Sequence, residues 1–249
     1  MMRTSDNGLD RRAASPLMIE NLRVALPGFE LSGISVAVRP GRITALLGHN
    51  GAGKTTSLRA MVGLIRKDGG SVRFEDGAGN ELEKRFRERI GYVPEEGFYY
   101  REFTIGELIA FSRRFYSRWD GAACERLLAA LDLDASKRIG ALSKGMRMKV
   151  GILLAFAHDP SILLLDEPTS GLDPRSRAEV VNLICSARAE GRGVLVATHN
   201  LAEVEQWADH IVILDHGQVL LDEGMATLRE RAERERAWSL ERLYLELVK

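Results

Sequence analysis

A glycine-rich loop between an apolar stretch and a stretch of helical periodicity restricts the fold of this chain more than any other feature. Residues 48–55 read Gly-His-Asn-Gly-Ala-Gly-Lys-Thr, which fits the pattern G-x-x-x-x-G-K-S/T at every fixed position. Residues 43–47 form a short apolar run typical of a buried strand, and apolar residues at helical spacing follow between Leu58 and Ile65. A strand, loop and helix in this order present backbone N–H groups and the positive end of a helix to phosphate oxygens. The loop therefore predicts a nucleotide-binding protein.

The side chains of the loop have distinct roles in this prediction. Lys54 can reach the β- and γ-phosphates, and the hydroxyl of Thr55 can ligate magnesium. The loop alone does not separate kinases, GTPases and motor ATPases, because all of them share it. The residues predicted to bind the nucleotide are Gly48, Asn50, Gly51, Ala52, Gly53, Lys54, Thr55 and Thr56.

Further apolar runs predict the sheet to which the loop belongs. Residues 162–165, 194–197 and 211–214 are continuous apolar runs separated by helix-like stretches. Such strands indicate a mostly parallel sheet that is covered on both faces. Between residues 17 and 42, shorter apolar stretches alternate with Gly and Pro, as in small strands and turns. We therefore expect an α/β fold with an additional small β subdomain.

The rest of the chain is expected to form smaller parts around a main domain of residues 17–225. Residues 1–16 are predicted to be a flexible polar tail. Residues from about 97 to 157 lack a long strand pattern and predict an inserted α-helical subdomain. Residues 226–249 contain a charged segment and then an amphipathic helix, whose apolar stripe more often docks on its own domain than on a partner.

The overall composition restricts which partners the protein can be expected to bind and in which cellular compartment it can be expected to work. The chain has 35 basic and 35 acidic residues, so net charge does not indicate nucleic acid or anionic lipid. Cys124 and Cys185 match no metal-binding spacing and are interpreted as small core thiols in a reducing compartment. No apolar run approaches the roughly twenty residues that span a bilayer, and the N-terminal residues do not resemble a secretory signal. We expect a cytoplasmic protein whose membrane role, if any, depends on a partner.

Two strand ends predict the chemistry that follows binding. The run 162–165 leads into Asp166 and Glu167, and the run 194–197 leads through Thr198 to His199. Carboxyl ends of parallel strands meet at one edge of a sheet, where ligands bind. Asp166 is predicted to support magnesium and Glu167 to polarise an attacking water. His199 could contact the γ-phosphate or hold Glu167, although a lone loop histidine is more often unremarkable.

The order of these motifs resembles that of the nucleotide-binding subunits of bacterial ABC transporters, from residue 17 to about residue 224. Besides the loop at residues 48–55 and the pair Asp166-Glu167, the chain has Leu-Ser-Lys-Gly-Met at residues 142–146, where the family has its signature. Ser-Gly-Leu-Asp at residues 170–173 matches the family's D-loop, and His199 its switch histidine. The resemblance implies a P-loop NTPase (RecA-like) fold with a small antiparallel β subdomain. It also implies ATP and Mg²⁺ as cofactors, and hydrolysis to ADP and phosphate coupled to transport.

The resemblance further implies a site shared between two subunits. Two such domains pair head to tail around two ATP molecules, each held by the loop of one subunit and the signature of the other. Ser143, Lys144 and Gly145 would then face the γ-phosphate in trans, and Asp173 would lie at the dimer seam. A helix N-terminus with a hydroxyl and a glycine is also a good anion site. Ser143 and Asp173 could instead be only helix caps, or could serve both purposes.

The chain departs from the family pattern at the signature and at the Q-loop. The signature usually reads Leu-Ser-Gly-Gly-Gln, so Lys144 adds a positive charge and Met146 removes an amide. The Q-loop usually has a glutamine where this chain has Glu95, after Tyr-Val-Pro at residues 92–94. A carboxylate can still face magnesium, but when ionised it cannot donate a hydrogen bond. Phe29 is the nearest candidate for the aromatic residue that usually stacks on adenine.

Aromatic residues are dense just after the Q-loop position. In the family, a groove there accepts a short cytoplasmic helix of a separately encoded membrane-spanning permease, and aromatics suit such interfaces. Most of these side chains could instead fill the core of the helical subdomain. We expect a split, with Phe98, Tyr99 and Tyr100 as the contact residues. The protein would then lie peripherally on the inner face of the cell membrane.

More than one function is consistent with these motifs. The leading hypothesis is a transporter motor of export type, for a drug, a peptide or a similar cargo. A soluble ABC-type ATPase that acts on a protein complex is an alternative, as is a slow nucleotide-gated switch, because of Lys144 and Glu95. The sequence leaves open whether the second nucleotide-binding subunit is identical or related, and it identifies no cargo.

Overall fold

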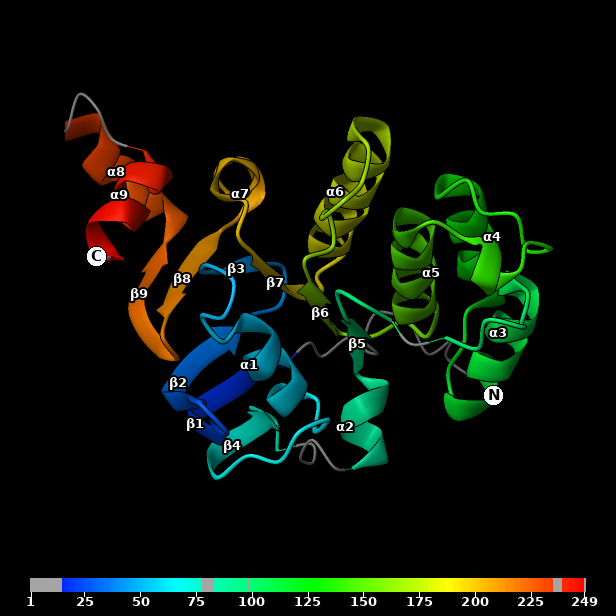
Figure 1. The fold of residues 1–249 in the computed structure, drawn as a ribbon, viewed down its shortest axis with the longest axis horizontal. Coiled ribbons are helices and arrows are strands. Elements are labelled where there is room, and N and C mark those ends of the chain that lie inside the picture. The colour runs from blue at the N-terminus through cyan, green and yellow to red at the C-terminus, as the bar shows by residue number, and fades with distance from the viewer. Residues whose placement is uncertain (1–14, 78–82, 98, 235–238, 249) are drawn as a thin grey trace, which may run out of the picture.

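The computed structural model describes residues 15–77, 83–97, 99–234 and 239–248, and it is built around a six-stranded sheet (Figure 1). The strand order is β5-β6-β7-β3-β8-β9. Neighbouring strands from β5 to β8 are parallel, and β9 is antiparallel to β8 at one edge. The strands are β3 (Ile43–Leu47), β5 (Ile90–Val93), β6 (Ile162–Asp166), β7 (Gly193–Thr198), β8 (His210–Asp215) and β9 (Gln218–Gly224).

A second, smaller sheet lies beside the first. Its order is β2-β1-β4, and β1 is antiparallel to both neighbours. The strands are β1 (Leu17–Leu26), β2 (Phe29–Val38) and β4 (Gly69–Phe74). The mostly parallel sheet with a small antiparallel sheet confirms the predicted fold class.

Helices cover both faces of the large sheet, and a group of helices lies beyond its edge strand β5. Between β5 and β6, the elements of the described residues are helical, and Figure 1 shows α3, α4 and α5 together at the end of the molecule beyond β5. These helices are α3 (Ile105–Ser112), η1 (Arg113–Phe115), α4 (Gly121–Ala130), η2 (Ile139–Ala141) and α5 (Lys144–Ala157). The helices outside this segment are α1 (Lys54–Met61), α2 (Lys84–Glu88), α6 (Pro174–Ala189), α7 (Leu201–Trp207), α8 (Met225–Arg234) and α9 (Leu240–Leu247).

The continuous apolar strands are explained by two hydrophobic cores, one on each face of the large sheet. In β3, Ile43, Ala45 and Leu47 belong to the core shared with α4, α5 and α6, whereas Leu46 belongs to the core shared with α1 and the small sheet. All five residues of β3 are buried. A strand that is buried on both faces is mostly apolar, since successive side chains alternate between the faces, and Thr44 is the single polar residue of β3.

The C-terminal segment lies against the domain rather than apart from it. Leu240 at the start of α9 is fully buried, and its backbone N–H donates to Glu205 of α7 at 2.6 Å. Leu243, Tyr244 and Leu247 pack against the same core as α5 and α6. The apolar stripe of α9 therefore docks on its own chain. Among the described residues, none of the helices combines the length and the apolar character needed to cross a bilayer.

Candidate functional site

The glycine-rich loop joins the end of β3 to the start of α1 and is held in a tight arch. A Cβ atom at Gly48 would lie 2.6 Å from the Leu214 carbonyl oxygen, so only glycine fits there. Gly53 has φ +112°, and a Cβ atom there would lie 2.8 Å from the Phe29 ring. The Ala52 N–H donates to the His49 carbonyl at 3.1 Å and closes the arch. The local sequence is therefore required by the backbone path.

This loop forms one wall of an open pocket of about 920 Å³. The lining also includes Leu26 and Pro27, Phe29 at the start of β2, and the carboxylates Glu95 and Glu167. Phe29 thus lies where an aromatic ring could meet the base of a nucleotide. Gly48 and Ala52 are buried behind the lining. The predicted residues that line the pocket are Asn50, Gly51, Gly53, Lys54, Thr55 and Thr56.

Lys54 is a buried cation aimed at the carbonyl groups of its own loop. Its side chain is 6% exposed, and its Nζ donates to Gly48 O at 2.7 Å and His49 O at 3.2 Å. The same Nζ lies 3.6 Å from Glu167 Oε1. These contacts hold the ammonium group at the mouth of the loop, where phosphate oxygens would exchange with the carbonyls as its partners.

Asp166 is a buried carboxylate at the end of β6. Burial raises its pKa to about 6; the Thr55 hydroxyl lowers this pKa, the Glu95 and Glu167 charges raise it, and Lys54 lowers it. Neither carboxylate oxygen of Asp166 accepts a hydrogen bond of good geometry within the described residues. Buried carboxylates are normally paired or bind a metal. Oxygen ligands from an aspartate and a threonine beside a phosphate site fit Mg²⁺.

Glu167 is held by three side chains from two segments, the end of β7 and the phosphate loop. The Thr198 hydroxyl donates to its Oε2 at 3.1 Å, and His199 Nδ1 donates to its Oε1 at 2.9 Å. Lys54 approaches the same Oε1. Glu167 also has φ +47°, in the left-handed region that non-glycine residues rarely adopt. The turn after β6 thus holds this carboxylate in a costly conformation, as is frequent at functional sites.

The structure therefore brings Lys54, Glu167 and His199 together, as the sequence suggested. The Thr198 contact was missed by the sequence analysis. Its signal was present, since Thr198 is the last residue of β7 and His199 follows it directly. A hydroxyl at this strand end can complete the set of donors around a buried carboxylate.

The signature residues lie outside this pocket, at the exposed start of α5. Ser143 is the N-cap of α5, and its side chain accepts from the Met146 N–H at 3.1 Å. A Cβ atom at Gly145 would lie 2.9 Å from a methyl group of Leu172. Asp173 is likewise the N-cap of α6 and accepts from Arg175 and Ser176. Both predicted caps are present, and neither signature nor D-loop residues line the loop pocket.

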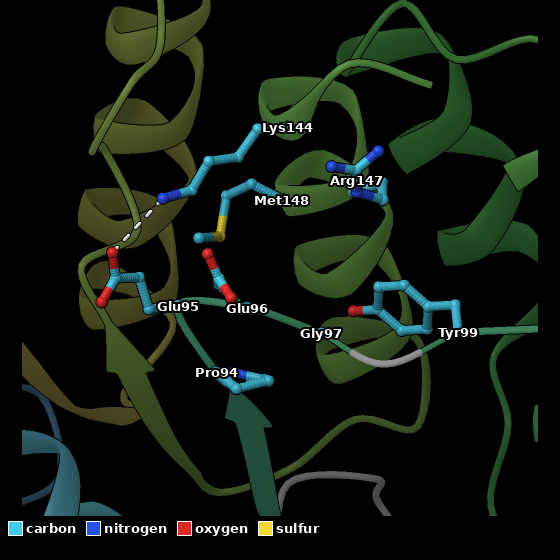
Figure 2. A pocket seen from close by; sticks show the side chains of 8 residues that line it. All are labelled: Pro94, Glu95, Glu96, Gly97, Tyr99, Lys144, Arg147 and Met148. Carbon is cyan, nitrogen blue, oxygen red and sulfur yellow. Dashed lines mark hydrogen bonds and ion pairs between the residues drawn. The ribbon is translucent and has the colours of Figure 1, made fainter. Parts of the chain in front are cut away.

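The two departures from the family pattern contact each other. Lys144 Nζ lies 3.3 Å from Glu95 Oε1, and both side chains are partly exposed, at 45% and 41% (Figure 2). Figure 2 shows the Lys144 side chain reaching across from α5 to the segment that follows β5. A small pocket of about 550 Å³ lies behind this pair, lined by Pro94, Glu95, Glu96, Gly97, Tyr99, Lys144, Arg147 and Met148. Glu95 also lines the pocket at the phosphate loop, so it lies between the two pockets.

The aromatic residues are split between the interior and the surface. Phe98 lies outside the described residues. Tyr99 packs against the core, and burial raises its pKa to about 12. Tyr100 is 56% exposed and its ring lies 5.6 Å from that of Phe111, which in turn contacts Phe115. A groove of about 790 Å³ runs here between α3, α5 and the segment after β5, with Tyr99, Phe111 and Phe115 in its lining.

Comparison with known proteins identifies the family to which the chain belongs. The family described as "ABC transporter" matches residues 31–170, more than half of the chain. An uncharacterized ABC transporter ATP-binding protein of Synechocystis sp. is 36% identical over 79% of this chain and 57% of its own length. The Nod factor export ATP-binding protein I of Burkholderia orbicola is 33% identical over 77% of this chain and 65% of its own length. The chain thus spans less than two thirds of either relative.

A solved structure matches over nearly the whole chain. The structure of an ATP-binding subunit of an ABC transporter superposes with a TM-score of 0.84 at 31% identity, covering 94% of this chain and 99% of the other. The chain therefore belongs to the ABC transporter family, among its ATP-binding subunits.

Proposed function

We propose that this chain hydrolyses ATP as the motor subunit of an ABC transporter. The observation that supports this most strongly is the buried Glu167 carboxylate, held by Thr198 and His199 within 3.6 Å of the loop lysine Lys54. A carboxylate held at the edge of a phosphate pocket can accept a proton from a water that attacks the γ-phosphate. His199 orients Glu167, and Lys54 stabilises the charge that develops on the phosphate oxygens.

The magnesium ion of the substrate complex would be held by Thr55 and Asp166. The ion would neutralise phosphate charge and orient the nucleotide. The unpartnered oxygens of Asp166 favour this assignment, since a cation would compensate their burial. Glu95 is a further candidate ligand because it lines the same pocket, although one of its oxygens faces Lys144.

A second chain, in the simplest case a second copy, would complete the site. Ser143 caps a 14-residue helix that begins with Lys144 and Gly145; Ser143 and Lys144 are exposed, and none of the three residues lines the chain's own phosphate pocket. A helix N-terminus that carries a hydroxyl and a lysine suits a phosphate. Asp173 is also exposed at a helix start close to Gly145 and Leu172, in keeping with a place at the seam.

The Lys144–Glu95 pair would link the nucleotide site to the partner groove. Glu95 touches the loop pocket on one side and precedes the segment that lines the aromatic groove on the other. When Lys144 turns to a phosphate, Glu95 loses its ion-pair partner and the segment after β5 is released. A membrane-spanning permease would dock in the groove through Tyr99. The exposed Tyr100, whose ring lies 5.6 Å from that of the groove residue Phe111, would add to the contact. The chain would thus lie on the cytoplasmic face of the membrane through this partner.

Export of a small or medium-sized cargo is the direction we favour. The relative from Burkholderia orbicola is described as a Nod factor export ATP-binding protein, and it is 33% identical over 77% of the present chain. Co-purification from detergent extracts tests this part of the proposal. Capture of a multi-span membrane protein supports it, whereas a chain that recovers only soluble partners would point to the alternative of an ATPase acting on soluble complexes.

The substitution Glu167→Gln tests hydrolysis directly. It keeps the shape and the hydrogen-bond acceptor but removes the base, so hydrolysis should fall by about 10²- to 10⁴-fold while ATP binding remains. Glu125→Gln, at an exposed glutamate of α4, is the matched control and should hydrolyse ATP like the parent. Phosphate release and fluorescent-nucleotide binding measure the two properties. If Glu167→Gln hydrolyses ATP as fast as the parent, Glu167 is not the group that accepts a proton from the attacking water.

A further inference from the structure

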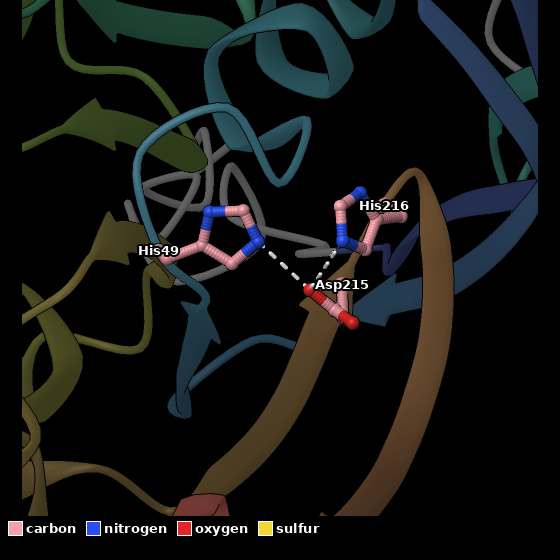
Figure 3. Close-up of side chains that lie close together, drawn as sticks. All are labelled: His49, Asp215 and His216. Atoms are coloured by element: carbon pink, nitrogen blue, oxygen red, sulfur yellow. Dashed lines mark hydrogen bonds and ion pairs between the residues drawn. The ribbon is translucent and has the colours of Figure 1, made fainter. Parts of the chain in front are cut away.

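Three side chains with metal-binding atoms converge next to the phosphate loop. His49 belongs to the loop, Asp215 ends β8, and His216 lies in the turn to β9. His49 Nε2 lies 2.8 Å from Asp215 Oδ1, and His216 Nε2 lies 3.9 Å from the same oxygen. The three donor atoms all lie within 4.8 Å of one another. Figure 3 shows both imidazole rings turned toward the one carboxylate.

The second nitrogen of His49 fixes which atom faces this cluster. His49 Nδ1 donates its hydrogen to the Asn50 carbonyl at 2.6 Å. Nε2 of the same ring lies 2.8 Å from Asp215 Oδ1, so both ring nitrogens face an oxygen acceptor. A neutral imidazole has a single N–H and can donate to only one of these oxygens. With Nδ1–H on the Asn50 carbonyl, the contact between Nε2 and Asp215 needs a cation, either a second proton or a metal ion. Metal-binding histidines typically donate their other N–H to a backbone carbonyl in this way.

The turn that carries two of the three residues is attached to the loop that carries the third. The Gly217 N–H donates to the Ala52 carbonyl of the phosphate loop at 3.0 Å. The Gly217 carbonyl accepts from the Ser32 N–H at 2.9 Å, which ties the turn to β2. His216 has φ +44°, so the turn backbone itself directs this side chain. The donor atoms are therefore held in place by the backbone rather than by chance contact of long side chains.

We propose that His49, Asp215 and His216 bind one zinc ion. Two imidazoles and a carboxylate suit Zn²⁺, whereas Mg²⁺ prefers oxygen ligands, so this site is distinct from that of Thr55 and Asp166. Tetrahedral zinc with ligands at 2.0–2.1 Å separates its donor atoms by about 3.4 Å. The observed separations from Asp215 Oδ1 are 2.8 and 3.9 Å, which bracket this value, and the two imidazole donors lie within 4.8 Å of each other, so side-chain rotations can bring the three atoms around one ion.

The ligand count and the exposure of the cluster define the kind of site. His49 is 40% exposed and His216 is 85% exposed, while Asp215 is 15% exposed. The ion would thus be bound at the surface with three protein ligands and a fourth position for water. Bound zinc would clip the start of the phosphate loop to the β8–β9 turn. This assignment does not depend on the proposed transport function.

Zinc binding to the full-length, untagged protein without nucleotide tests the proposal. Isothermal titration should show one high-affinity zinc per chain, and Co²⁺ should give the strong visible absorption of a tetrahedral site. His216→Asn removes one ligand at an exposed position, and asparagine tolerates the positive φ. This variant should lower zinc affinity by at least about tenfold and abolish the cobalt spectrum. Parent-like zinc affinity in His216→Asn would overturn the proposal.

A matched control comes from the same strand. His210 of β8 forms a pair with Asp222 of β9 and has no third ligand beside it among the described residues. His210→Asn should therefore bind zinc within about twofold of the parent. An equal loss in His210→Asn and His216→Asn would indicate dispersed binding to histidines and would contradict the proposed site. Failure of the parent to bind zinc would leave a proton as the cation between His49 and Asp215, and would also refute it.

Hydrogen exchange locates the ion independently of affinity. Zinc should slow amide exchange in residues 49–52 and 215–217 of the parent, because it joins the two segments. His49→Gln and His216→Asn should both lack this protection while keeping parent-like exchange elsewhere. Protection at other segments only, or at these segments in the variants as well, would count against the assignment.

Discussion

The two ends of the chain's nucleotide machinery differ in how completely they are built. At the phosphate loop, Lys54 and Glu167 are 6% and 7% exposed, and their polar atoms have fixed partners. At the start of α5, Ser143 and Lys144 are exposed, and the Lys144–Glu95 pair is open to solvent. Interactions in a buried site are strong, whereas an exposed ion pair contributes little. The fold thus holds the groups at the phosphate loop through buried contacts, whereas the start of α5, which we propose binds the phosphate of a second chain, is open to solvent.

The largest effect is expected on the loop side, from Lys54→Met. Loss of this buried cation should lower hydrolysis by at least about 10³-fold and nucleotide affinity by about 10- to 100-fold, because it removes charge-assisted hydrogen bonds to phosphate. Lys149→Met is the matched control, since Lys149 is an equally buried lysine that pairs with Glu179 instead. That control should lose stability and keep its nucleotide affinity. Equal nucleotide affinities in Lys54→Met and Lys149→Met would show that Lys54 has no special role in nucleotide binding.

The substitution Ser143→Ala tests whether the start of α5 binds a phosphate in addition to capping its own helix. If Ser143 contacts a phosphate of a second chain, hydrolysis should fall by about 10²-fold while each chain still binds nucleotide. Loss of the cap alone should cost about 1 kcal/mol of stability. Thr104→Ala removes the cap of α3 and should show the same loss of stability with unchanged hydrolysis. Identical hydrolysis in the two variants would reduce Ser143 to a helix cap.

Asp166→Asn should make the protein more stable while impairing hydrolysis. The folded pKa of Asp166 is about 6, above its ordinary value of 3.8, so the folded state retains a proton that the unfolded state has lost between these pH values. Stability should therefore fall by up to about 3 kcal/mol as pH rises from 4 to 6, and Asp166→Asn should remove this fall. Urea unfolding of both proteins at several pH values, without magnesium or nucleotide, measures it.

A carboxylate that has hydrogen-bond and ion-pair partners should change stability in the opposite direction when it is replaced by asparagine. Asp209 accepts from the Ile43 N–H at 2.8 Å and faces Arg42 and Arg188. Asp209→Asn should destabilise the protein at neutral pH in the same unfolding measurements. An increase in stability for Asp209→Asn, or a decrease for Asp166→Asn, would show that partners do not distinguish these two carboxylates.

The smallest effect is expected from the exposed Lys144–Glu95 pair. A double-mutant cycle of Lys144→Gly and Glu95→Gln, which installs the usual family residues, should give a coupling energy of at most about 1 kcal/mol in stability. The hydrolysis rate should change more in either single variant than in the double variant, because each single change leaves one unpaired charge near the nucleotide. Strictly additive rates would show that the two residues act independently.

The buried side of the site was predictable from the sequence because its determinants are local. The loop pattern, the apolar runs and the charged residues at their ends occupy short segments, and the parallel sheet brings the ends of β3, β6 and β7 together. The roles of Lys54, Glu167 and His199 depend on those strand ends alone. Their mutual distances agree with that prediction, while the chemistry assigned to each residue stays a prediction.

The contacts that the sequence did not reveal join distant segments. Lys144 and Glu95 are 49 positions apart, and His49 and Asp215 are 166 apart. No periodicity in the sequence reports such pairs, since they depend on how α5 packs against the segment after β5 and on how the β8–β9 turn packs against the phosphate loop. Thr198 was overlooked for another reason: a threonine at a strand end is ordinary until the carboxylate it contacts is known.

The most direct measurement of the central claim is the mass of Glu167→Gln in solution with and without ATP and magnesium. If the phosphate loop of one chain needs the α5 start of another, ATP should convert chains of 27.6 kDa into dimers of twice that mass, and Ser143→Ala in the same background should prevent it. Light scattering coupled to size-exclusion chromatography reports both states. A single-chain mass at saturating ATP would contradict the account.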